Sequence, residues 1–360
     1  MKVRLLILFT SLVLLHSFLI VSACSTGNNN ETSSNCKTIE LDQFTVTDLS
    51  GKGRLVTDDV DIMGVVSSLE VTDNGYIAIC QNRQDAHVIL YNPRTDSSKT
   101  VMIRGEGPME MLRVSTMSSD SDGNLWLVGL MDKKVMKVNC NADGSDASVE
   151  AVFRLPEDCL RGVTDGEGGI IALHGGNRQS RLIQLDADAH IIDSMGNYPN
   201  TKMPDGVCPT NFIFQSDMAF SPDVDKVAIA CKSWNYIDIV DRQTKETIGL
   251  TLPIDAPIEL KSFEAGGAVS YNPAPFWLMF SDVEATRESF FVGYIGAKVE
   301  SPSDLDKQIN SILEFDWDGN PLKILKFSND VVTFSVSKDG KTLYTVENAP
   351  DPALFEYQLN

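Results

Sequence analysis

An asparagine–arginine–glutamine triplet occurs twice in the sequence, once starting with Asn82 and Arg83 and once with Asn177 and Arg178. Each copy follows a short apolar run, and His174 lies just before the second copy. Two guanidinium groups on one rim of a protein can hold a carboxylate or a sulfate through paired hydrogen bonds. The alternative is a repeated loop in which each arginine pairs with a neighbouring acid. We expect these five residues to lie at a ligand-binding mouth.

A third loop places two aromatic residues beside an amide, at Trp234, Asn235 and Tyr236. Exposed rings of this kind can stack on a sugar or on a peptide side chain, because they present an apolar body and a polar tip. The alternative is packing between neighbouring sheets. Glu347 and Asn348 add a carboxylate and an amide in a corresponding loop near the C-terminus, for which an ordinary loop is the alternative.

Metal-binding chemistry has little support in the residue pattern. The chain beyond its leader has three histidines, His87, His174 and His190, which is too sparse a set for a three-histidine centre. Two aspartate-rich segments, 120–124 and 316–320, begin like a calcium-binding EF-hand loop but lack its twelfth-position glutamate in a helical context. We therefore expect both segments to be hairpin turns, and we expect no bound metal or cofactor.

Catalytic motifs are also missing from the sequence. It has no Gly-x-Ser-x-Gly elbow for a nucleophilic serine, and the glycines at 105–107 do not lead into a helix that could bind phosphate. We expect no catalysis. The alternative is a hydrolase or lactonase that holds a calcium ion in a central channel, with the candidate ligands Glu70, Asn177, Asn235 and Asp217.

A recurring turn-and-strand unit must position all of these loops. Asp-Gly and Asn-Gly turns between apolar runs are strong hairpin signals, and each unit continues with a loop and a second strand. Six copies are visible, the fifth being the weakest, at residues 72–79, 120–128, 164–173, 221–230, 272–280 and 337–346. Six units of about four short strands each predict a six-bladed β-propeller. The alternatives are a seven-bladed ring and a two-sheet β-solenoid.

The repeat covers one domain, which we expect at residues 37–360. The last copy ends before a fourth strand, so we expect residues 37–46 to supply the missing outer strand and close the ring. Loops that follow the second strand of each blade should converge at the channel mouth. The triplets and the aromatic loop all occupy this position in their copies.

The first 23 residues read as a signal peptide. Lys2 and Arg4 precede an apolar run at 5–21, and the segment ends in Ser22-Ala23-Cys24. This ending resembles a bacterial lipobox, which implies cleavage before Cys24 and lipid attachment to its thiol and new amino group. An ordinary secretory signal or a single anchoring helix is the alternative. Residues 24–36 then read as a lipidated cysteine and a flexible polar tether.

The leader predicts a lipid-anchored protein of the cell envelope. An aspartate directly after the lipidated cysteine would resemble an inner-membrane retention signal. Residue 25 is serine, which favours the outer membrane. The periplasmic and surface-exposed faces both stay open. Six cysteines remain beyond Cys24, and fifteen full disulfide pairings are conceivable. Cys80 and Cys231 end apolar strands and fit buried free thiols equally well.

The overall charge excludes one class of partner. The chain has 50 acidic and 30 basic residues, a formal net charge of −20, with 42% hydrophobic and 22% charged residues. This balance is that of a folded soluble domain, not of a disordered or polytopic membrane protein. Nucleic-acid binding requires Lys and Arg to neutralise phosphates, so the acid surplus disfavours it.

The chain resembles the TolB-like six-bladed β-propeller lipoproteins of Gram-negative bacteria. The resemblance covers about residues 37–360 and rests on the lipobox, the spaced Asp-Gly turns and the segment Arg104–Met111. That segment is similar to a Gly-x-Gly-Pro-x-Glu-aromatic junction between blades, with Met111 in place of the aromatic residue. The resemblance implies a fold more than an activity. We expect a monomeric, membrane-anchored binding or scaffold propeller that recognises a peptide, glycan or partner protein at its channel mouth.

Overall fold

The computed structural model describes residues 36–83, 85–140, 147–174, 180–198, 214–221, 223–255, 259–265, 268–274, 276–348 and 350–359, with the backbone alone at 259–274. The segment Glu31–Asn360 forms one compact unit. No helix among these residues is long and apolar enough to cross a membrane. The expected signal peptide at 1–23, the lipid site at Cys24 and the tether lie outside the described residues.

Successive stretches of the described chain form four-stranded antiparallel sheets whose strands pair in chain order. The first contains β4 (Val66–Val71), β5 (Ile77–Gln81), β6 (Val88–Asn92) and β7 (Ser97–Met102). The second contains β8 (Val114–Ser119), β9 (Leu125–Gly129), β10 (Lys134–Asn139) and β11 (Ser148–Arg154). The third contains β12 (Cys159–Thr164), β13 (Ile170–His174), β14 (Ser180–Leu185) and β15 (Ile191–Asn197). The fourth contains β16 (Ser216–Ser221), β17 (Lys226–Cys231), β18 (Ile237–Asp241) and β19 (Thr247–Thr251), and β1 (Cys36–Thr38) joins it as a fifth, parallel strand.

The C-terminal part of the chain forms one larger sheet that is built from two such groups. Its strands are β22 (Phe276–Ala285), β23 (Ser289–Val299), β24 (Ile309–Asp316), β25 (Pro321–Val336), β26 (Thr342–Asn348), β27 (Pro352–Gln358) and β3 (Arg54–Thr57). The first half of β25 pairs with β24 and its second half with β26. β25 is therefore the outer strand of one group and the inner strand of the next.

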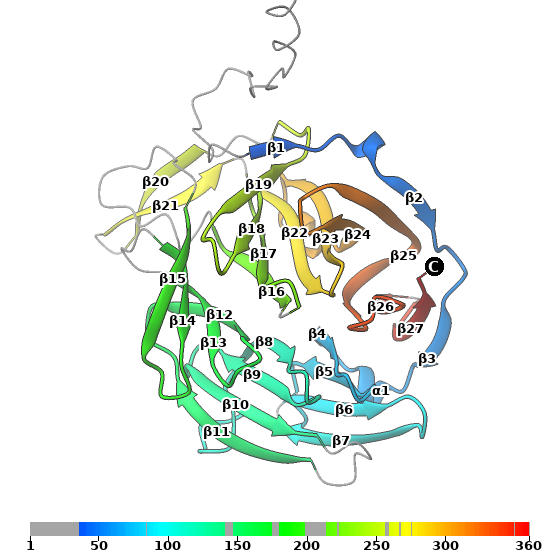
Figure 1. The fold of residues 1–360 in the computed structure, drawn as a ribbon. Coiled ribbons are helices and arrows are strands. Elements are labelled where there is room, and N and C mark those ends of the chain that lie inside the picture. Colours follow the sequence, from blue (N-terminus) through cyan, green and yellow to red (C-terminus); the bar gives the residue numbers. More distant parts are fainter. Residues whose placement is uncertain are drawn as a thin grey trace, which may run out of the picture. The chain divides into compact units, whose positions relative to one another are not determined.

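The inner strands close a ring. β4, β8, β12, β16, β22 and β25 contact one another in this order, and β25 contacts β4 again. Figure 1 shows the sheets arranged around a common centre with these strands on the inside. The described chain is thus an all-β propeller, as the turn spacing predicts. The remaining elements are peripheral: η1 (Leu41–Gln43), α1 (Val60–Met63), η2 (Pro302–Asp306) and the hairpin of β20 (Glu259–Ala265) and β21 (Ala268–Ala274).

Alternating burial explains why the repeated strands are apolar throughout. In β9, Leu125 and Leu127 pack against the first sheet, while Trp126 and Val128 pack against the third. All four side chains are buried because successive residues of a strand face opposite sides and each side of this sheet has a neighbour. Strands at blade interfaces therefore lack the apolar–polar alternation of a half-exposed sheet.

One predicted repeat is placed wrongly. Residues 272–274 lie in β21 instead of a turn, and 276–280 begin the inner strand β22 instead of a second strand. The corresponding turn falls at Thr286–Ser289, where the Thr286 N–H bonds to the Ser289 carbonyl. This turn has no Asp-Gly pair, which is why the pattern does not reveal it.

The N-terminal segment 36–57, here called the N-terminal belt, runs along the outer edges of successive sheets (Figure 1). β1 (Cys36–Thr38) pairs in parallel with β19, and β2 (Thr45–Asp48) pairs in parallel with β25. β3 pairs with β27 in antiparallel orientation and completes the last group. The prediction that residues 37–46 supply this closing strand is therefore wrong. They cover the outer edge of the fourth sheet at β19 and the outer edge of the first group of the C-terminal sheet at β25, where backbone groups would otherwise be unpaired.

Three of the cysteines, Cys80, Cys140 and Cys231, are buried free thiols. Burial also raises the pKa of the Cys80 and Cys140 thiols, which favours their protonated, unreactive form. The interpretation of Cys80 and Cys231 as buried thiols is confirmed. Cys208 lies outside the described residues.

Candidate functional site

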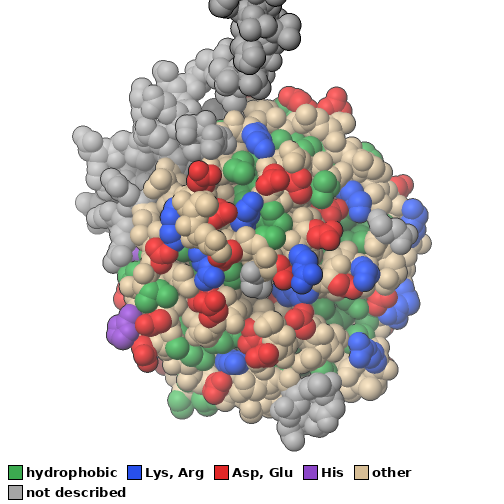
Figure 2. Space-filling model, in the orientation of Figure 1, with side chains coloured by type: hydrophobic (Ala, Val, Ile, Leu, Met, Phe, Trp, Pro, Cys, Tyr) green, Lys and Arg blue, Asp and Glu red, His purple; other side chains and the backbone are tan. Residues whose placement is uncertain are grey.

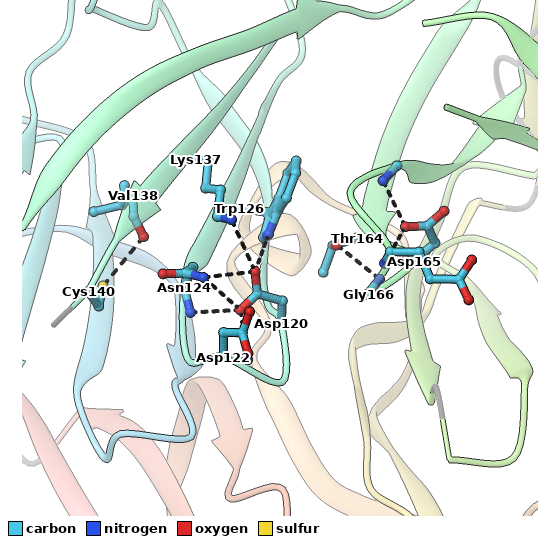
Figure 3. Close-up of polar contacts among 12 residues, drawn as sticks. Asp120, Asp122, Asn124, Trp126, Lys137, Val138, Cys140, Thr164, Asp165 and Gly166 are labelled. Atoms are coloured by element: carbon cyan, nitrogen blue, oxygen red, sulfur yellow. Dashed lines mark hydrogen bonds and ion pairs between the residues drawn. The ribbon is translucent and has the colours of Figure 1, made fainter. Parts of the chain in front are cut away.

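The Asp-Gly turns form hairpins whose aspartates are used within the turn (Figure 3). The Asp120 carboxylate accepts hydrogen bonds from the Asn124 N–H (2.8 Å) and the Trp126 indole (2.9 Å), with Lys137 at 3.7 Å. Asp165 likewise accepts from the Gly169 N–H (2.8 Å). The prediction that segment 120–124 is a hairpin turn is confirmed, and both carboxylate oxygens of Asp120 already have donors.

A cavity of about 1090 Å³ opens among these turns, and we call it the turn cavity. Its lining comes from the ends of the inner strands and the turns that follow, including Glu70, Asp73, Phe220, Glu284, Glu288 and Lys338. Ten acidic and five basic side chains line it. Figure 2 shows the same mixture of charges across the visible face of the ring, with neither sign gathered into one continuous patch. The turn cavity itself has an acidic surplus.

Two buried glutamates share one lysine in the wall of the turn cavity. Glu70 on β4 lies 3.3 Å from the Lys338 ammonium and accepts a hydrogen bond from Ser119 (2.6 Å). Glu284 on β22 accepts from Ser335 (3.2 Å). Burial, and next the charge of Glu70, raises the pKa of Glu284 well above its usual value. We call Glu70, Glu284 and Lys338 the glutamate–lysine cluster.

A second charged cluster lies next to the turn cavity along the same inner strands. Asp217 on β16 is 2.6 Å from the Arg161 guanidinium of β12 and 2.7 Å from the Lys232 ammonium. Although burial alone would raise the pKa of Asp217, these two cations lower it to about 2. Burial, and next the charge of Asp217, raises the pKa of Asp282 on β22 to about 6. We call Arg161, Asp217, Lys232 and Asp282 the inner cluster.

The residues of the first predicted triplet pair with their neighbours. Arg83 lies 3.3 Å from Asp85 and 3.8 Å from Asp61, and Asn82 accepts a hydrogen bond from Arg104 (2.7 Å). This is the alternative considered from the sequence, in which the arginine simply pairs with nearby acids. Asn177 and Arg178 of the second triplet lie outside the described residues.

The aromatic loop is buried, so the prediction of exposed rings is wrong. Trp234 and Tyr236 are 5% and 1% exposed, and their rings stack with centroids 4.9 Å apart. Phe214 contacts the Trp234 ring edge-on at 5.2 Å. Asn235 donates to the Leu252 carbonyl (2.7 Å) and accepts from its N–H (2.9 Å). The loop therefore ties β17 and β18 to the segment that follows β19.

Two further candidates also have structural partners. His174 is 1% exposed and lies 2.5 Å from the Asp158 carboxylate. Glu347 is equally buried and accepts hydrogen bonds from Tyr357 (2.6 Å) and Thr345 (2.8 Å). Neither residue lines the turn cavity.

Strand direction explains why the predicted loops do not meet at the turn cavity. The inner strand of each group runs toward its turn, and the second strand runs back toward the other end of the ring. Loops after the second strand, such as the one holding Asn82 and Arg83, therefore lie opposite the turns. None of Asn82, Arg83, His174, Trp234, Asn235 and Tyr236 is among the residues that line the turn cavity.

Three of the four candidate calcium ligands are among the described residues, and each has a separate partner. Glu70 belongs to the glutamate–lysine cluster, Asp217 to the inner cluster, and Asn235 binds the backbone of Leu252. The described residues do contain one compact set of metal-type side chains, Asp186 with Asp188 and His190. It is an exposed turn in which Asp186 accepts from the N–H groups of both partners, so its geometry is that of a hairpin.

The sequence pattern did not reveal four members of the two charged clusters, namely Arg161, Glu284, Asp282 and Lys338. A signal was present, because Glu284 interrupts the apolar run Val283–Ala285 just before a turn. A charged residue within an otherwise apolar strand indicates a polar partner or a polar space beside it. Inner strands, however, cannot be told from second strands by periodicity alone when both are buried.

Comparison with known proteins identifies the family. No curated protein matches the sequence. The solved β-propeller domain of Myceliophteria thermophila Cps50 (Swd1) is 9% identical, with a TM-score of 0.43, over 82% of this chain and 97% of that one. A Bacteroides fragilis protein described as exported is 13% identical, with a TM-score of 0.53, over 90% of this chain and all of that one. The family model for TolB-like 6-blade propeller-like proteins matches residues 68–339, and the chain belongs to this family.

Proposed function

We propose that this chain is a binding propeller that holds a positively charged segment of a partner protein in the turn cavity, without catalysis. The acidic surplus of the cavity wall carries the proposal, because opposite charge is what steers and holds such a segment. The turn cavity is lined by the Asp-Gly turns and not by the loop that carries the first triplet.

Two acids at the rim support a cationic ligand. Asp73 and Glu288 line the cavity and have no hydrogen-bond or ion-pair partner among the described residues. Burial raises the pKa of Asp73, Lys338 opposes this rise, and the negative charges of Glu70 and Asp120 add to it. A bound ammonium or guanidinium group would relieve this repulsion.

The same proposal includes six blades and a lipid anchor. The closed cycle of six inner strands supports the blade count, and the family's description agrees with it. The basic, apolar and small-residue pattern of the leader supports cleavage before Cys24 and attachment to a membrane of the cell envelope. The anchored propeller would act as a monomer, with its turn cavity open to a partner.

A binding titration with tetralysine tests the proposed ligand charge, with tetraglutamate as the opposite-charge probe. We expect the mature protein to bind tetralysine, more weakly as salt is added, and to ignore tetraglutamate. The double variant Asp73→Asn, Glu288→Gln should bind several-fold more weakly. The control Glu246→Gln, Glu300→Gln removes the same charge away from the cavity and should change little. Equal losses in both variants would refute a site in the turn cavity.

A calcium-dependent hydrolase has no supporting observation among the described residues. Thermal melting of the mature protein with EDTA, and then with added calcium, tests this alternative directly. We expect the same melting temperature in both conditions. A drop of several degrees with EDTA that calcium reverses would favour the calcium alternative over the binding propeller.

A further inference from the structure

The inner cluster brings together side chains from separate strands of the ring. Arg161 comes from β12, Asp217 from β16, Asp282 from β22 and Thr333 from β25, and Lys232 follows β17. Met218 and Val283, the next residues after Asp217 and Asp282, line the turn cavity. On β16 and β22 the cluster therefore lies one residue along the chain from the wall of the turn cavity.

When Asp282 is protonated, the two cations of this cluster outnumber its one ionised carboxylate, Asp217. Arg161 and Lys232 share Asp217, and the Arg161 Nη1 also donates to the Ser115 carbonyl at 2.7 Å. The side chains of Arg161 and Lys232 are 22% and 27% exposed. The Nη2 and Nε groups of Arg161 and the other protons of Lys232 have no partner among the described residues. These donors can reach solvent and bind an anion.

Two buried polar atoms beside the cations also lack partners. Thr333 is 1% exposed, and its hydroxyl oxygen has no hydrogen-bond partner in the described chain. The same is true of Asp282 Oδ2, whose residue has a φ of 51° where β22 bulges between Ser281 and Val283. Bulges commonly re-aim a side chain near a functional site, and buried unpaired polar atoms are costly. The Thr333 hydroxyl faces the Asp282 carboxyl, so a ligand oxygen placed here would compete with that contact for both groups.

We propose that the inner cluster is a binding subsite for the carboxylate group of an organic acid, held by Arg161 and Lys232 beside the Thr333 hydroxyl. A guanidinium group matches the two oxygens of a carboxylate, and the ammonium adds a second charge. The carboxylate belongs either to a free small acid or to the C-terminus of the segment in the turn cavity. The subsite does not depend on the proposed cationic ligand, because its probe is an anion.

Protonation of Asp282 should control this subsite. Asp282 is faced by Arg161 of β12, Asp217 of β16, Lys232 after β17 and Thr333 of β25, and Glu284 lies near it on its own strand. A neutral Asp282 leaves the cluster with a surplus positive charge and can donate a hydrogen bond to the ligand. Because its pKa is about 6, anion affinity should rise as the pH falls through this value.

Calorimetric titration of the mature protein with lactate, which stays ionised across this range, tests the proposal. We expect binding about tenfold tighter at about pH 5.5 than at about pH 7.5. Lys232→Gln should weaken it at least about tenfold, while Lys226→Gln, which breaks an ion pair with Asp318 elsewhere, should not. Asp282→Asn should bind lactate without the pH dependence, because asparagine also tolerates a positive φ.

Three results would overturn the subsite: no lactate binding by the wild type, full binding by Lys232→Gln, or an unchanged pH dependence in Asp282→Asn. Circular dichroism of each variant confirms its fold.

Tetralysine with a free or an amidated C-terminus distinguishes the two sources of the carboxylate. If Lys232→Gln weakens binding of the free-carboxylate peptide but not of the amidated peptide, the bound carboxylate is a chain end. If the two peptides bind alike, the carboxylate belongs to a free small acid. Lactate binding without tetralysine binding would support the subsite and refute the cationic ligand.

Discussion

In the glutamate–lysine cluster and in the inner cluster, two side chains of like charge share one partner of opposite charge, and the signs are reversed between the two clusters. In the first, one cation is shared by two buried carboxylates, and in the second, one carboxylate is shared by two cations. A surplus carboxylate can take up a proton, as the raised pKa of Glu284 indicates. A surplus guanidinium cannot lose its proton in a protein. The first cluster can therefore lose its surplus charge by taking up a proton, whereas protonation of Asp282 leaves the second with a surplus positive charge.

Removing the shared carboxylate should have the largest effect on folding. Asp217→Asn leaves Arg161 and Lys232 together without their common partner, and we expect a loss of about 3 kcal/mol in the free energy of unfolding near neutral pH. Glu70→Gln leaves Lys338 with Glu284 and should cost about 1 kcal/mol. Urea unfolding of both variants measures the difference, and equal losses would contradict the contrast between the clusters.

Removing the shared lysine should give a pH-dependent loss. Lys338→Met leaves Glu70 and Glu284 close together in a buried site, at a cost of about 2 kcal/mol near neutral pH. The deficit should shrink on acidification, because the two carboxyl groups then take up protons and stop repelling each other. Urea unfolding across a pH series measures this trend. A deficit that stays constant with pH would mean that the two glutamates do not interact.

Asp282 should make the inner cluster less stable as the pH rises. Its pKa is raised from 3.8 to about 6 in the folded protein, so its contribution is fully present below about pH 4 and is lost as the pH rises through about 6. Asp282→Asn should therefore exceed the wild type by about 3 kcal/mol at about pH 7.5 and match it near pH 4. Thermal melting at both pH values measures this, with exposed Asp306→Asn as a flat control.

The smallest effect is expected outside both clusters. Arg83→Ala breaks two ion pairs whose acids are 75% and 88% exposed, so the free energy of unfolding should fall by less than about 0.5 kcal/mol. Chemical denaturation of Arg83→Ala measures this small loss, against which the larger losses of the cluster variants are compared. A loss comparable to that of Asp217→Asn would place Arg83 in a network that the described contacts do not contain.

The sequence predicts the all-β ring well because turn chemistry is local. Asp-Gly pairs set the hairpins, and the positive φ of Gly123 and Gly340 shows the backbone that these turns require. Ring closure by Arg54–Thr57 is not local, since this strand is short and its partner lies at the far end of the chain. The site is missed for a related reason. Exposure of Trp234 depends on Phe214 and Tyr236 around it, and the sequence does not encode such contacts in any short pattern.

The N-terminal belt has a consequence for the order in which the protein is made. Thr38 faces Thr251, Thr45 faces Lys323, and Arg54 bonds to Glu356, which is 302 positions later in the chain. A ribosome therefore releases the belt long before its partners exist, and contacts of such high sequence separation form slowly. The first described strands to be translated are among the last to pair, so the ring closes only after the final strand has left the ribosome.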